Sequence, residues 1–391
     1  MNFYQHAIQL QPQTQAHRRY FHQNAEVGLD TPKAVAYITQ ELKKLGLDPR
    51  PCGHGVTATI GSGNPCILLR ADMDGLPMAE ESGESFACTI KSAAHTCGHD
   101  LHAAMLLTAA AMLAEQQDSL KGTVKLMFQP AEEILQGAQD MLDAGILMNP
   151  SVDAALSFHV AAGKMPPGLI LYNASGAMMA SADNFRVTIH GKSSHGAYPQ
   201  EAISSIRIAA CLCTALDGLI PAETDPRKMC ILSLGQLHSG SAPNIIPDLA
   251  ILEGTIRCDD DACRRHLLKR TEQLACAIAA AHGGSAEFEV LNGVPPLVCD
   301  PELTVQMADF IRDLDIPGAT MHPGMAANAS EDFARIAAAV PGSFFYLSAG
   351  FQDERGDYLA HNPKVRFNED VLPIGAACYA HCAVLWLSAH K

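Results

Sequence analysis

Residues 122–133 read GTVKLMFQPAEE, an apolar segment that ends at a proline and is followed at once by two carboxylates. Val124, Leu126 and Phe128 alternate along it, and a period of two is typical of a β-strand. A second apolar run, PCILLR at 65–70, is expected to be a buried strand as well. Helix-like segments alternate with these strands in this part of the chain. The alternation predicts an α/β fold, with a mixed, mostly parallel sheet and helices on both faces.

The middle of the chain has a different order of elements. Between Asn184 and Leu291 the pattern predicts strand, helix, strand, strand, helix and strand, the split βαβ order of ferredoxin-like domains. This pattern ends at NGVPP, residues 292–296, which is a natural linker. A chain of 391 residues is also too long for one ordinary core. We therefore expect an α/β domain formed by residues 1–182 and 296–391, interrupted by an inserted ferredoxin-like α+β domain at 183–295.

The composition indicates a folded, acidic protein. Hydrophobic residues make up 48% and charged residues 18% of the chain, and the formal net charge of −15 disfavours nucleic acid as a partner. We see no apolar stretch of about 18 or more residues, and residues 1–15 lack the order of a secretory signal. We expect no membrane partner and a cytoplasmic location. Most of the 13 cysteines stand singly in apolar segments, as small core residues do.

The segment HTCGHDLH at 95–102 holds the densest set of reactive side chains. Cys97 and His99 stand just before an expected helix, where the positive helix end stabilises a thiolate. Zinc accepts both thiolate and imidazole ligands. Taken alone, the pair is equally compatible with a polar helix cap beside a buried cysteine.

Further metal-binding side chains follow the expected strands. Ligands of open α/β sheets bind beyond the carboxyl ends of the strands, and most of these side chains stand at such ends. Their number favours two metal ions close together over one tetrahedral site. Asp72, Asp74 and Asp100 are candidates to accept the second N–H of the ligating imidazoles, or else they cap loops. The side chains that join Cys97 and His99 in this set are Glu132, Glu133, His159 and His361.

A series of motifs resembles the aminoacylase/carboxypeptidase metallohydrolase family. The most similar branch holds hippurate hydrolases, indole-acetyl-amino-acid hydrolases and N-acetyl-diaminopimelate deacetylases. The resemblance runs nearly end to end, and its order is highly specific. The motifs are RRYFH at 18–22, RADMDGLP at 70–77, CGHD at 97–100, QPAEE at 129–133, GKSSHGAYP at 191–199, PNIIP at 243–247, GTIR at 254–257, SEDF at 330–333 and HNP at 361–363.

The resemblance implies hydrolysis of N-acyl-L-amino acids, hippurate-like or N-acetylated, to a carboxylate and a free amino acid. Glu132 would be the general base, and His195 would steady the oxyanion. Asn244 and Arg257 would hold the substrate's carboxylate. The inserted domain would be a lid through which a homodimer forms. Two divalent metals, zinc or manganese or else cobalt or nickel, would be bound by Cys97, His99, Glu133, His159 and His361.

Two segments depart from the family pattern, and three other functions stay open. Residues 157–163 lack the aromatic that commonly follows the family histidine by two positions, and the loop at 350–359 is long and charged. A dipeptidase or small-peptide carboxypeptidase could use the same site. A metal-binding protein without catalysis is the second alternative. The third is an enzyme that uses Cys97 with His99 as a nucleophile pair.

Overall fold

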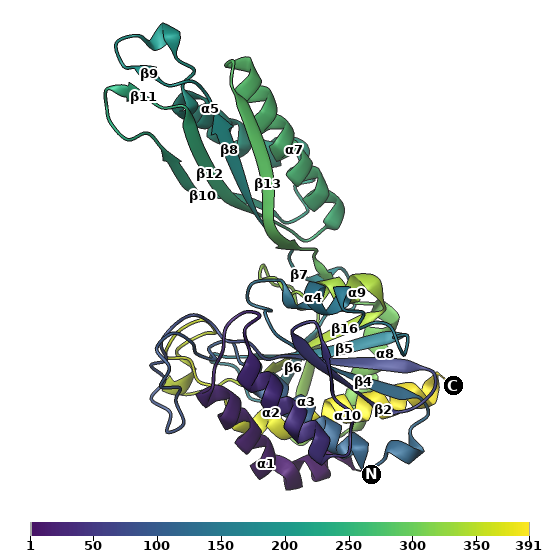
Figure 1. Ribbon diagram of the computed structural model, residues 1–391. Coiled ribbons are helices and arrows are strands. Elements are labelled where there is room, and N and C mark those ends of the chain that lie inside the picture. Colours follow the sequence, from purple (N-terminus) through teal and green to yellow (C-terminus); the bar gives the residue numbers. More distant parts are fainter. Residues whose placement is uncertain (1, 391) are drawn as a thin grey trace. The chain divides into compact units, whose positions relative to one another are not determined.

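The structure is a computed structural model that describes residues 2–390. The chain forms two compact units, drawn with their elements in Figure 1. Unit 1 contains the residues up to Met178, then Val298–Ala326, and those from Asp332 on, whereas unit 2 contains Met179–Leu297 and Ala327–Glu331. These divisions lie within four residues of the expected positions 182 and 295. The segment 327–331, expected in the α/β domain, groups with unit 2 instead.

The sheet of unit 1 has eight strands in the order β1-β2-β4-β3-β5-β16-β6-β15. Its four central strands run parallel and are buried almost throughout, as parallel strands covered on both faces should be. They are β4 (Thr123–Gln129), β3 (Cys66–Asp72), β5 (Ala154–Ala161) and β16 (Gly342–Ser348). The outer strands are β1 (Arg50–Cys52), β2 (Gly55–Gly61), β6 (Leu169–Tyr172) and β15 (Thr320–Pro323). The predicted mixed, mostly parallel sheet is confirmed.

Helices cover both faces of this sheet (Figure 1). On one face α3 packs against β3 and β5, α10 lies beside α3, and α1 lies across both helices. The short helices α4 and α9 lie on the other face and contact β4 and β16. The helices of unit 1 are α1 (Phe3–Gln23), α2 (Pro32–Lys44), α3 (His99–Ala114), α4 (Gly137–Asp143), α8 (Pro301–Asp313), α9 (Ala334–Ala339) and α10 (Leu372–Ala389).

Helix α10 corrects the expectation that no segment has the character of a membrane span. The stretch Glu369–Ala389 has a mean hydropathy of 1.6 and is long enough to cross a bilayer by length and composition. However, 78% of the 18-residue window that meets this criterion is buried inside the protein. Side chains such as Cys378 and Tyr379 are fully buried in the core of unit 1. Packing on all sides therefore accounts for its apolar sequence.

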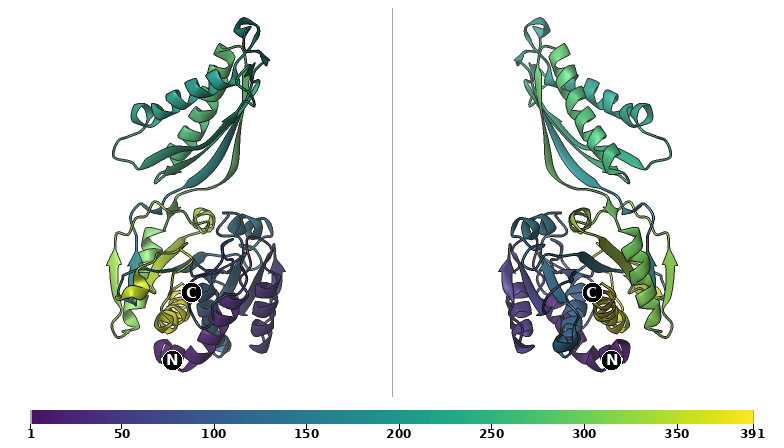
Figure 2. Two further views of the ribbon diagram at one scale, coloured as in Figure 1. Left: turned by 90° about the vertical axis from the view of Figure 1, so that its left-hand side faces the viewer. Right: turned by 90° about the vertical axis from the view of Figure 1, so that its right-hand side faces the viewer.

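Unit 2 has the ferredoxin-like order of elements. Its four-stranded antiparallel sheet has the order β10-β12-β8-β13. The two long helices lie together against one face of this sheet (Figure 2) and enclose a core that includes Val187, Ile189 and Leu252. The elements are β8 (Ala182–His190), α5 (Ser205–Asp217), α6 (Leu219–Glu223), β10 (Cys230–Ser239), β12 (Leu249–Cys258), α7 (Asp261–Ala281) and β13 (Ser285–Val294). Two short strands, β9 (Ser194–His195) and β11 (Ile245–Ile246), pair with each other, and β7 (Ala177–Met179) and β14 (Leu297–Val298) lie at the chain connections between the units.

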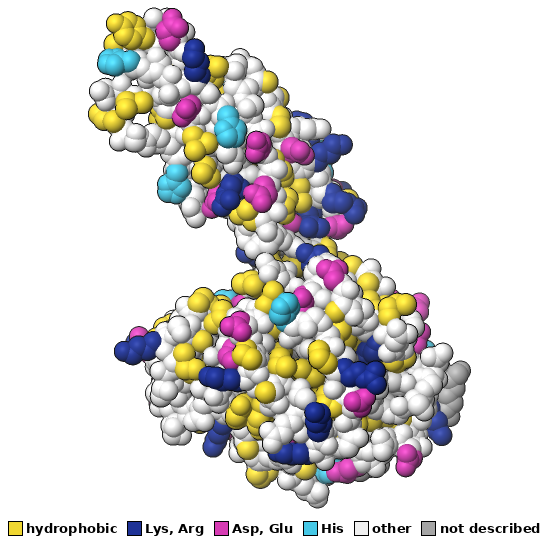
Figure 3. Space-filling model, in the orientation of Figure 1, with side chains coloured by type: hydrophobic (Ala, Val, Ile, Leu, Met, Phe, Trp, Pro, Cys, Tyr) yellow, Lys and Arg dark blue, Asp and Glu magenta, His cyan; other side chains and the backbone are white. Residues whose placement is uncertain are grey.

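The surface carries charges of both signs. Over the face drawn in Figure 3, basic and acidic side chains are interspersed. A protein that binds nucleic acid by electrostatics gathers its basic side chains on one face instead.

Candidate metal centre

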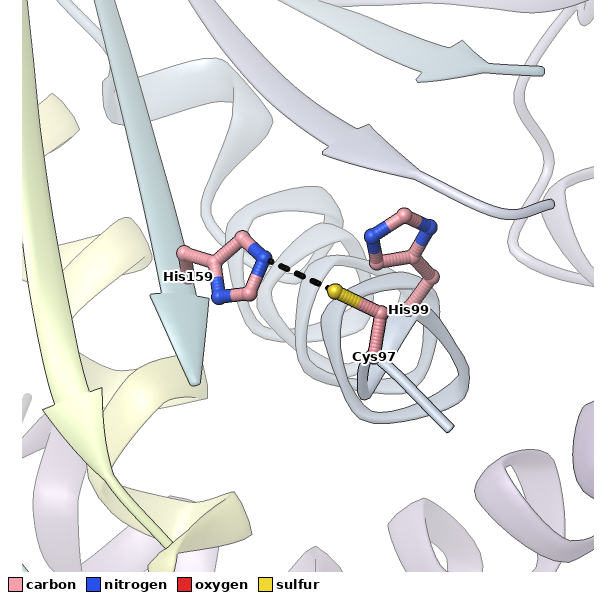
Figure 4. A group of neighbouring side chains, drawn as sticks. All are labelled: Cys97, His99 and His159. Carbon is pink, nitrogen blue, oxygen red and sulfur yellow. Dashed lines mark hydrogen bonds between the residues drawn. The ribbon is translucent and has the colours of Figure 1, made fainter. Parts of the chain in front are cut away.

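The turn before α3 brings Cys97 and His99 to the carboxyl end of the central strands. Gly98 between them has a φ of 98°, and a Cβ there would lie 2.3 Å from Cγ2 of Val160. Only glycine fits this backbone without strain. His159, near the end of β5, points toward Cys97 (Figure 4), and its Nε2 lies 3.6 Å from Cys97 Sγ. Three of the expected ligands thus come together from α3 and β5.

His361 and Glu133 approach the same thiol from two loops. His361 Nε2 lies 3.3 Å from Cys97 Sγ and 3.4 Å from Glu133 Oε2. The backbone N–H of His361 donates to the carbonyl of Thr96 at 2.9 Å, which ties its loop to the segment before Cys97. His361 also has a φ of 67°, a left-handed conformation that costs a non-glycine residue about 1 kcal/mol. All five expected ligands are therefore neighbours in space.

The hydrogen bonds of the imidazoles leave their Nε2 atoms free to bind a cation. A carbonyl can only accept, so His99 Nδ1 donates to the carbonyl of Asp74 at 2.9 Å, and His159 Nδ1 donates to that of Val160 at 2.7 Å. In the neutral ring, which is the form that binds a metal, the second nitrogen then carries a lone pair. Among the described residues, His99 Nε2 and Glu133 Oε1 are buried atoms without a hydrogen-bond partner, and they lie 3.9 Å apart. Unpartnered buried acceptors of this kind fit a metal site.

Cys97 belongs to two separate groups of donor atoms. One is formed with His99 and His159, and the other with Glu133 and His361. Within each group all ligand atoms lie within 4.8 Å of one another. The two groups would hold two divalent cations, since thiolate, imidazole and carboxylate are all ligands of zinc and related metals.

The electrostatics of the site favour a cation over a reactive thiol. Burial and the neighbouring Glu133 carboxylate raise the pKa of the Cys97 thiol well above its ordinary value. Burial also raises the pKa of Glu133. A divalent cation stabilises both deprotonated forms and so reverses these shifts. A thiol held neutral is a poor nucleophile, which counts against the cysteine-nucleophile alternative.

The backbone after β4 separates the two adjacent carboxylates. Ala131 has a φ of 57°, so the chain turns sharply there. The carboxylate of Asp74 accepts the backbone N–H of Glu132 at 3.1 Å and that of Glu133 at 3.2 Å. Glu132 Oε2 lies 3.9 Å from His99 Nε2, and only 6% of Glu132 is exposed. Glu132 thus faces the ligand cluster from a sheltered position, where a general base is needed.

Asp72 and Asp100, expected beside the ligating imidazoles, make their hydrogen bonds to other side chains, although Asp72 Oδ2 lies 3.8 Å from His99 Nε2. Asp72 accepts from His102 Nδ1 at 2.5 Å and from Arg70, while Asp100 accepts from His22 at 2.8 Å and from Arg18. These two carboxylates therefore orient histidines outside the expected ligand set. Asp74 does lie beside a ligand, although its backbone carbonyl rather than its carboxylate makes the shorter contact with His99.

Sequence reasoning missed His102 as a structural partner of the site. His102 Nε2 accepts the backbone N–H of Val160 at 2.8 Å, and His102 Nδ1 donates to the carboxylate of Asp72. Both nitrogens are therefore engaged, and the ring holds β5 against β3 behind His159. A signal was present, because His102 lies three residues after His99 and so on the same face of α3.

The expected catalytic residue His195 and the two expected substrate-binding residues, Asn244 and Arg257, all lie in unit 2. His195 on β9 and Asn244 before β11 are exposed neighbours, since the carbonyl of Asn244 accepts the N–H of Gly196 at 2.8 Å. Asn244 lies shortly before the first residue of β12, whereas Arg257 lies near the last residue of that strand. There, Arg257 Nη1 donates to the carbonyl of Asn328 at 3.2 Å. The structure thus brings His195 and Asn244 together but not Arg257.

Comparison with known proteins supports these findings at the level of sequence. Residues 68–384 match the Peptidase family M20/M25/M40. The chain is 37% identical over 378 residues to IAA-amino acid hydrolase ILR1-like 2 of Arabidopsis thaliana, which covers 95% of this chain and 84% of that protein. It is 33% identical over 376 residues to Thermostable carboxypeptidase 2 of Saccharolobus solfataricus. That match covers 94% of this chain and 93% of the carboxypeptidase.

A solved structure agrees with the fold. The YXEP protein of Bacillus subtilis, described as a dinuclear metal binding peptidase from the M20 family, matches with a TM-score of 0.81 and 28% identity over 97% of this chain and 99% of that one. The aminoacylase/carboxypeptidase resemblance of the motifs is thereby confirmed. The chain is a hydrolase that belongs to the Peptidase family M20/M25/M40.

Proposed function

We propose that the protein hydrolyses the amide bond of N-acyl-L-amino acids, hippurate-like or N-acetylated, and releases a carboxylate and a free amino acid. The observation that carries the proposal is the cluster around Cys97, in which the unpartnered His99 Nε2 and Glu133 Oε1 lie 3.9 Å apart with Glu132 beside them. This arrangement supports a hydrolytic centre in which a carboxylate base faces a metal-bound substrate.

Five side chains would hold two divalent cations in this cluster. We propose zinc or manganese, with cobalt or nickel as alternatives, because the mixed sulfur, nitrogen and oxygen ligands suit all four. When bound, the cations lower the pKa of a water molecule and polarise the amide carbonyl. The ligands are Cys97, His99, Glu133, His159 and His361.

Glu132 would act as the general base. Its carboxylate takes a proton from the attacking water, whose oxygen bonds to the carbonyl carbon. The C–N bond then breaks, and Glu132 returns the proton to the leaving amine nitrogen. Asp74 supports this role because it anchors the backbone of Glu132 and of Glu133, and so keeps the base and a ligand in register.

His195 would donate a hydrogen bond to the developing oxyanion. Its Nδ1 accepts the N–H of Ala197 at 3.1 Å, so in the neutral ring Nε2 carries the proton. An N–H donor is what a tetrahedral oxyanion requires. Asn244, next to His195, and Arg257 would bind the substrate's carboxylate, for which the planar guanidinium is well suited.

The positions of these residues support a homodimer through unit 2. Leu249 pairs with His190 at the end of the sheet near β9, whereas Arg257 lies eight residues further along β12. At roughly 3.3 Å per residue this separates the two ends by about 26 Å. A small N-acyl amino acid cannot span that distance. We therefore propose that His195 and Asn244 of one protomer complete a site with Arg257 of the other.

We further propose that the enzyme acts in the cytoplasm. All thirteen cysteines are free thiols. Structural disulfides form and persist in oxidising compartments, and reduced cysteines are typical of the cytosol.

A dipeptidase or small-peptide carboxypeptidase activity is the second candidate. The similarity to Thermostable carboxypeptidase 2 favours it, since that relative matches over 94% of the chain. The same base and ligands would serve, and only the group on the acyl side of the bond differs.

The test is a panel of N-acetyl and N-benzoyl amino acids beside dipeptides that end in the same amino acids. We expect turnover of the N-acyl compounds, and Glu132→Gln should keep the metal content while turnover falls by roughly 10²–10⁴-fold. Turnover of the dipeptides alone would establish the second candidate. Full activity in Glu132→Gln would remove that residue from the mechanism.

A further inference from the structure

Three thiols gather in one corner of unit 2, at the end of the sheet that also carries Arg257. Cys230 begins β10, Cys258 ends β12, and Cys263 lies in the first turn of α7. Cys258 belongs to the core between the sheet and its helices, and Cys230 and Cys263 pack against that core. Cys258 is fully buried, whereas Cys230 and Cys263 are partly exposed.

The sheet places Cys230 directly opposite Cys258. The N–H of Cys258 donates to Ser181 Oγ at 2.9 Å, and its carbonyl accepts the N–H of Ser181 at 2.7 Å. Both polar groups of Cys258 therefore point away from β10. The next residue, Asp259, donates across to the carbonyl of Met229 at 3.1 Å, as the alternation of an antiparallel ladder requires. Cys230 and Cys258 are thus a non-hydrogen-bonded cross-strand pair.

The geometry of such a pair suits a disulfide. In non-hydrogen-bonded pairs the Cα atoms lie about 4.5 Å apart and the side chains are at their closest. Disulfides join Cα atoms that are roughly 4.4–6.8 Å apart. Burial and the adjacent Cys230 thiol raise the pKa of Cys258, which agrees with direct contact between the two sulfurs. Cys230, partly exposed, is the member that a small oxidant can reach.

We propose that Cys230 and Cys258 are an oxidation site. A hydroperoxide oxidises the two thiols to a reversible cross-strand disulfide. The Cys230 thiolate attacks one oxygen of the hydroperoxide, so that an S–O bond forms, the O–O bond breaks, and the other oxygen takes up a proton and leaves as an alcohol, or as water when the oxidant is hydrogen peroxide. The sulfur of Cys258 then attacks the Cys230 sulfur, the S–S bond forms as the S–O bond breaks, and the displaced hydroxyl leaves as water with the proton of the Cys258 thiol. Two thiols are oxidised and one peroxide is reduced.

The bond would tie together the open ends of the β10–β12 hairpin. β10 is the outermost strand of the sheet and pairs only with β12 among the described strands. A covalent link between Cys230 and Cys258 holds that edge strand in place when the ladder opens locally. The amides of β10 therefore exchange with solvent more slowly in the oxidised protein than in the reduced protein.

The experiment is a peptide map of the whole protein without reduction, after treatment with hydrogen peroxide and alkylation of the remaining thiols. We expect one linked peptide pair that contains Cys230 and Cys258, lighter than the two free peptides by two hydrogen atoms. Cys263→Ser should still form it, and Cys258→Ser should not. The exposed Cys211 and Cys276 serve as internal controls, because their oxidation shows that the peroxide acted.

Two results would overturn the proposal. One is a link between Cys230 and Cys263, which would mean that the helix rather than the neighbouring strand supplies the partner. The other is full alkylation of Cys230 and Cys258 when Cys211 and Cys276 are already oxidised. The wild-type map decides between these outcomes even if Cys258→Ser does not fold.

Discussion

Asp74 is the residue that joins the separate segments of the metal centre. Its carbonyl fixes the tautomer of His99, and its carboxylate holds the backbone of Glu132 and of Glu133. Because Asp74 is completely buried, these bonds form in a medium of low dielectric and are stronger than in water. One residue, through its backbone carbonyl and its carboxylate, therefore sets the relation between two proposed ligands and the proposed base.

His22 provides a prediction about pH. Although burial opposes its charge, the hydrogen bonds and charges of Asp100 and Glu80 raise the pKa of His22 to about 9. The folded value lies above the unfolded value of about 6.5, so the stabilisation is complete below about pH 6.5 and is lost as the pH rises through about 9. Between about pH 7 and pH 9.5 we expect wild type to lose about 2 kcal/mol more unfolding free energy than His22→Gln. Urea unfolding at a series of pH values checks this, and parallel profiles would contradict it.

The residue roles were only partly predictable from sequence. Cys97, His99, Glu133 and His159 stand at strand ends or at a helix start, so their convergence follows from the rule for open α/β sheets. The partners of Asp100 could not be predicted in this way. One of them, His22, lies 78 residues away, on a helix that no periodic pattern in the sequence predicted. A hydrogen bond at that separation depends on how α1 packs on α3.

The start of α3 gives a prediction at the scale of an element. An alanine at Gly98 must adopt a left-handed φ and would also clash with Val160. Gly46 is a matched control, since its φ is 78° and nothing lies within 4 Å of a Cβ there. We expect Gly46→Ala to cost roughly 1–2 kcal/mol from backbone strain alone and Gly98→Ala roughly 2–5 kcal/mol.

The Gly98→Ala variant should also bind less metal, because the glycine separates two proposed ligands. Urea unfolding and elemental analysis of both variants measure the two effects. If Gly98→Ala and Gly46→Ala lost equal stability and kept equal metal, the turn would not position the ligands.

The elements differ in how far the sequence revealed them. The strands around Leu68 and Leu126 were predicted almost to the residue, because the first is a short apolar run and the second alternates with a period of two. The apolar residues of α10 show no helical periodicity, because the helix is buried on all sides. The short outer strands β1 and β15 were missed, since their pairing depends on distant partners.

At the scale of the whole molecule, the proposed dimer predicts that two inactive variants restore one another. His195→Ala and Glu132→Gln are each expected to be nearly inactive. In a purified heterodimer of the two, one site has both an intact Glu132 and an intact His195 from the other chain. We expect about half of the wild-type activity per dimer, because a two-fold dimer has two such sites. A heterodimer as inactive as its parents would mean that His195 serves its own chain.

The central claim is that five side chains from separate segments bind two cations around the sulfur of Cys97. Anomalous X-ray diffraction from crystals of the metal-loaded protein tests it most directly. We predict two anomalous peaks per chain, one contacted by His99 and His159 and the other by Glu133 and His361, with Cys97 between them. A metal-loaded crystal without an anomalous peak beside Cys97 would contradict the claim.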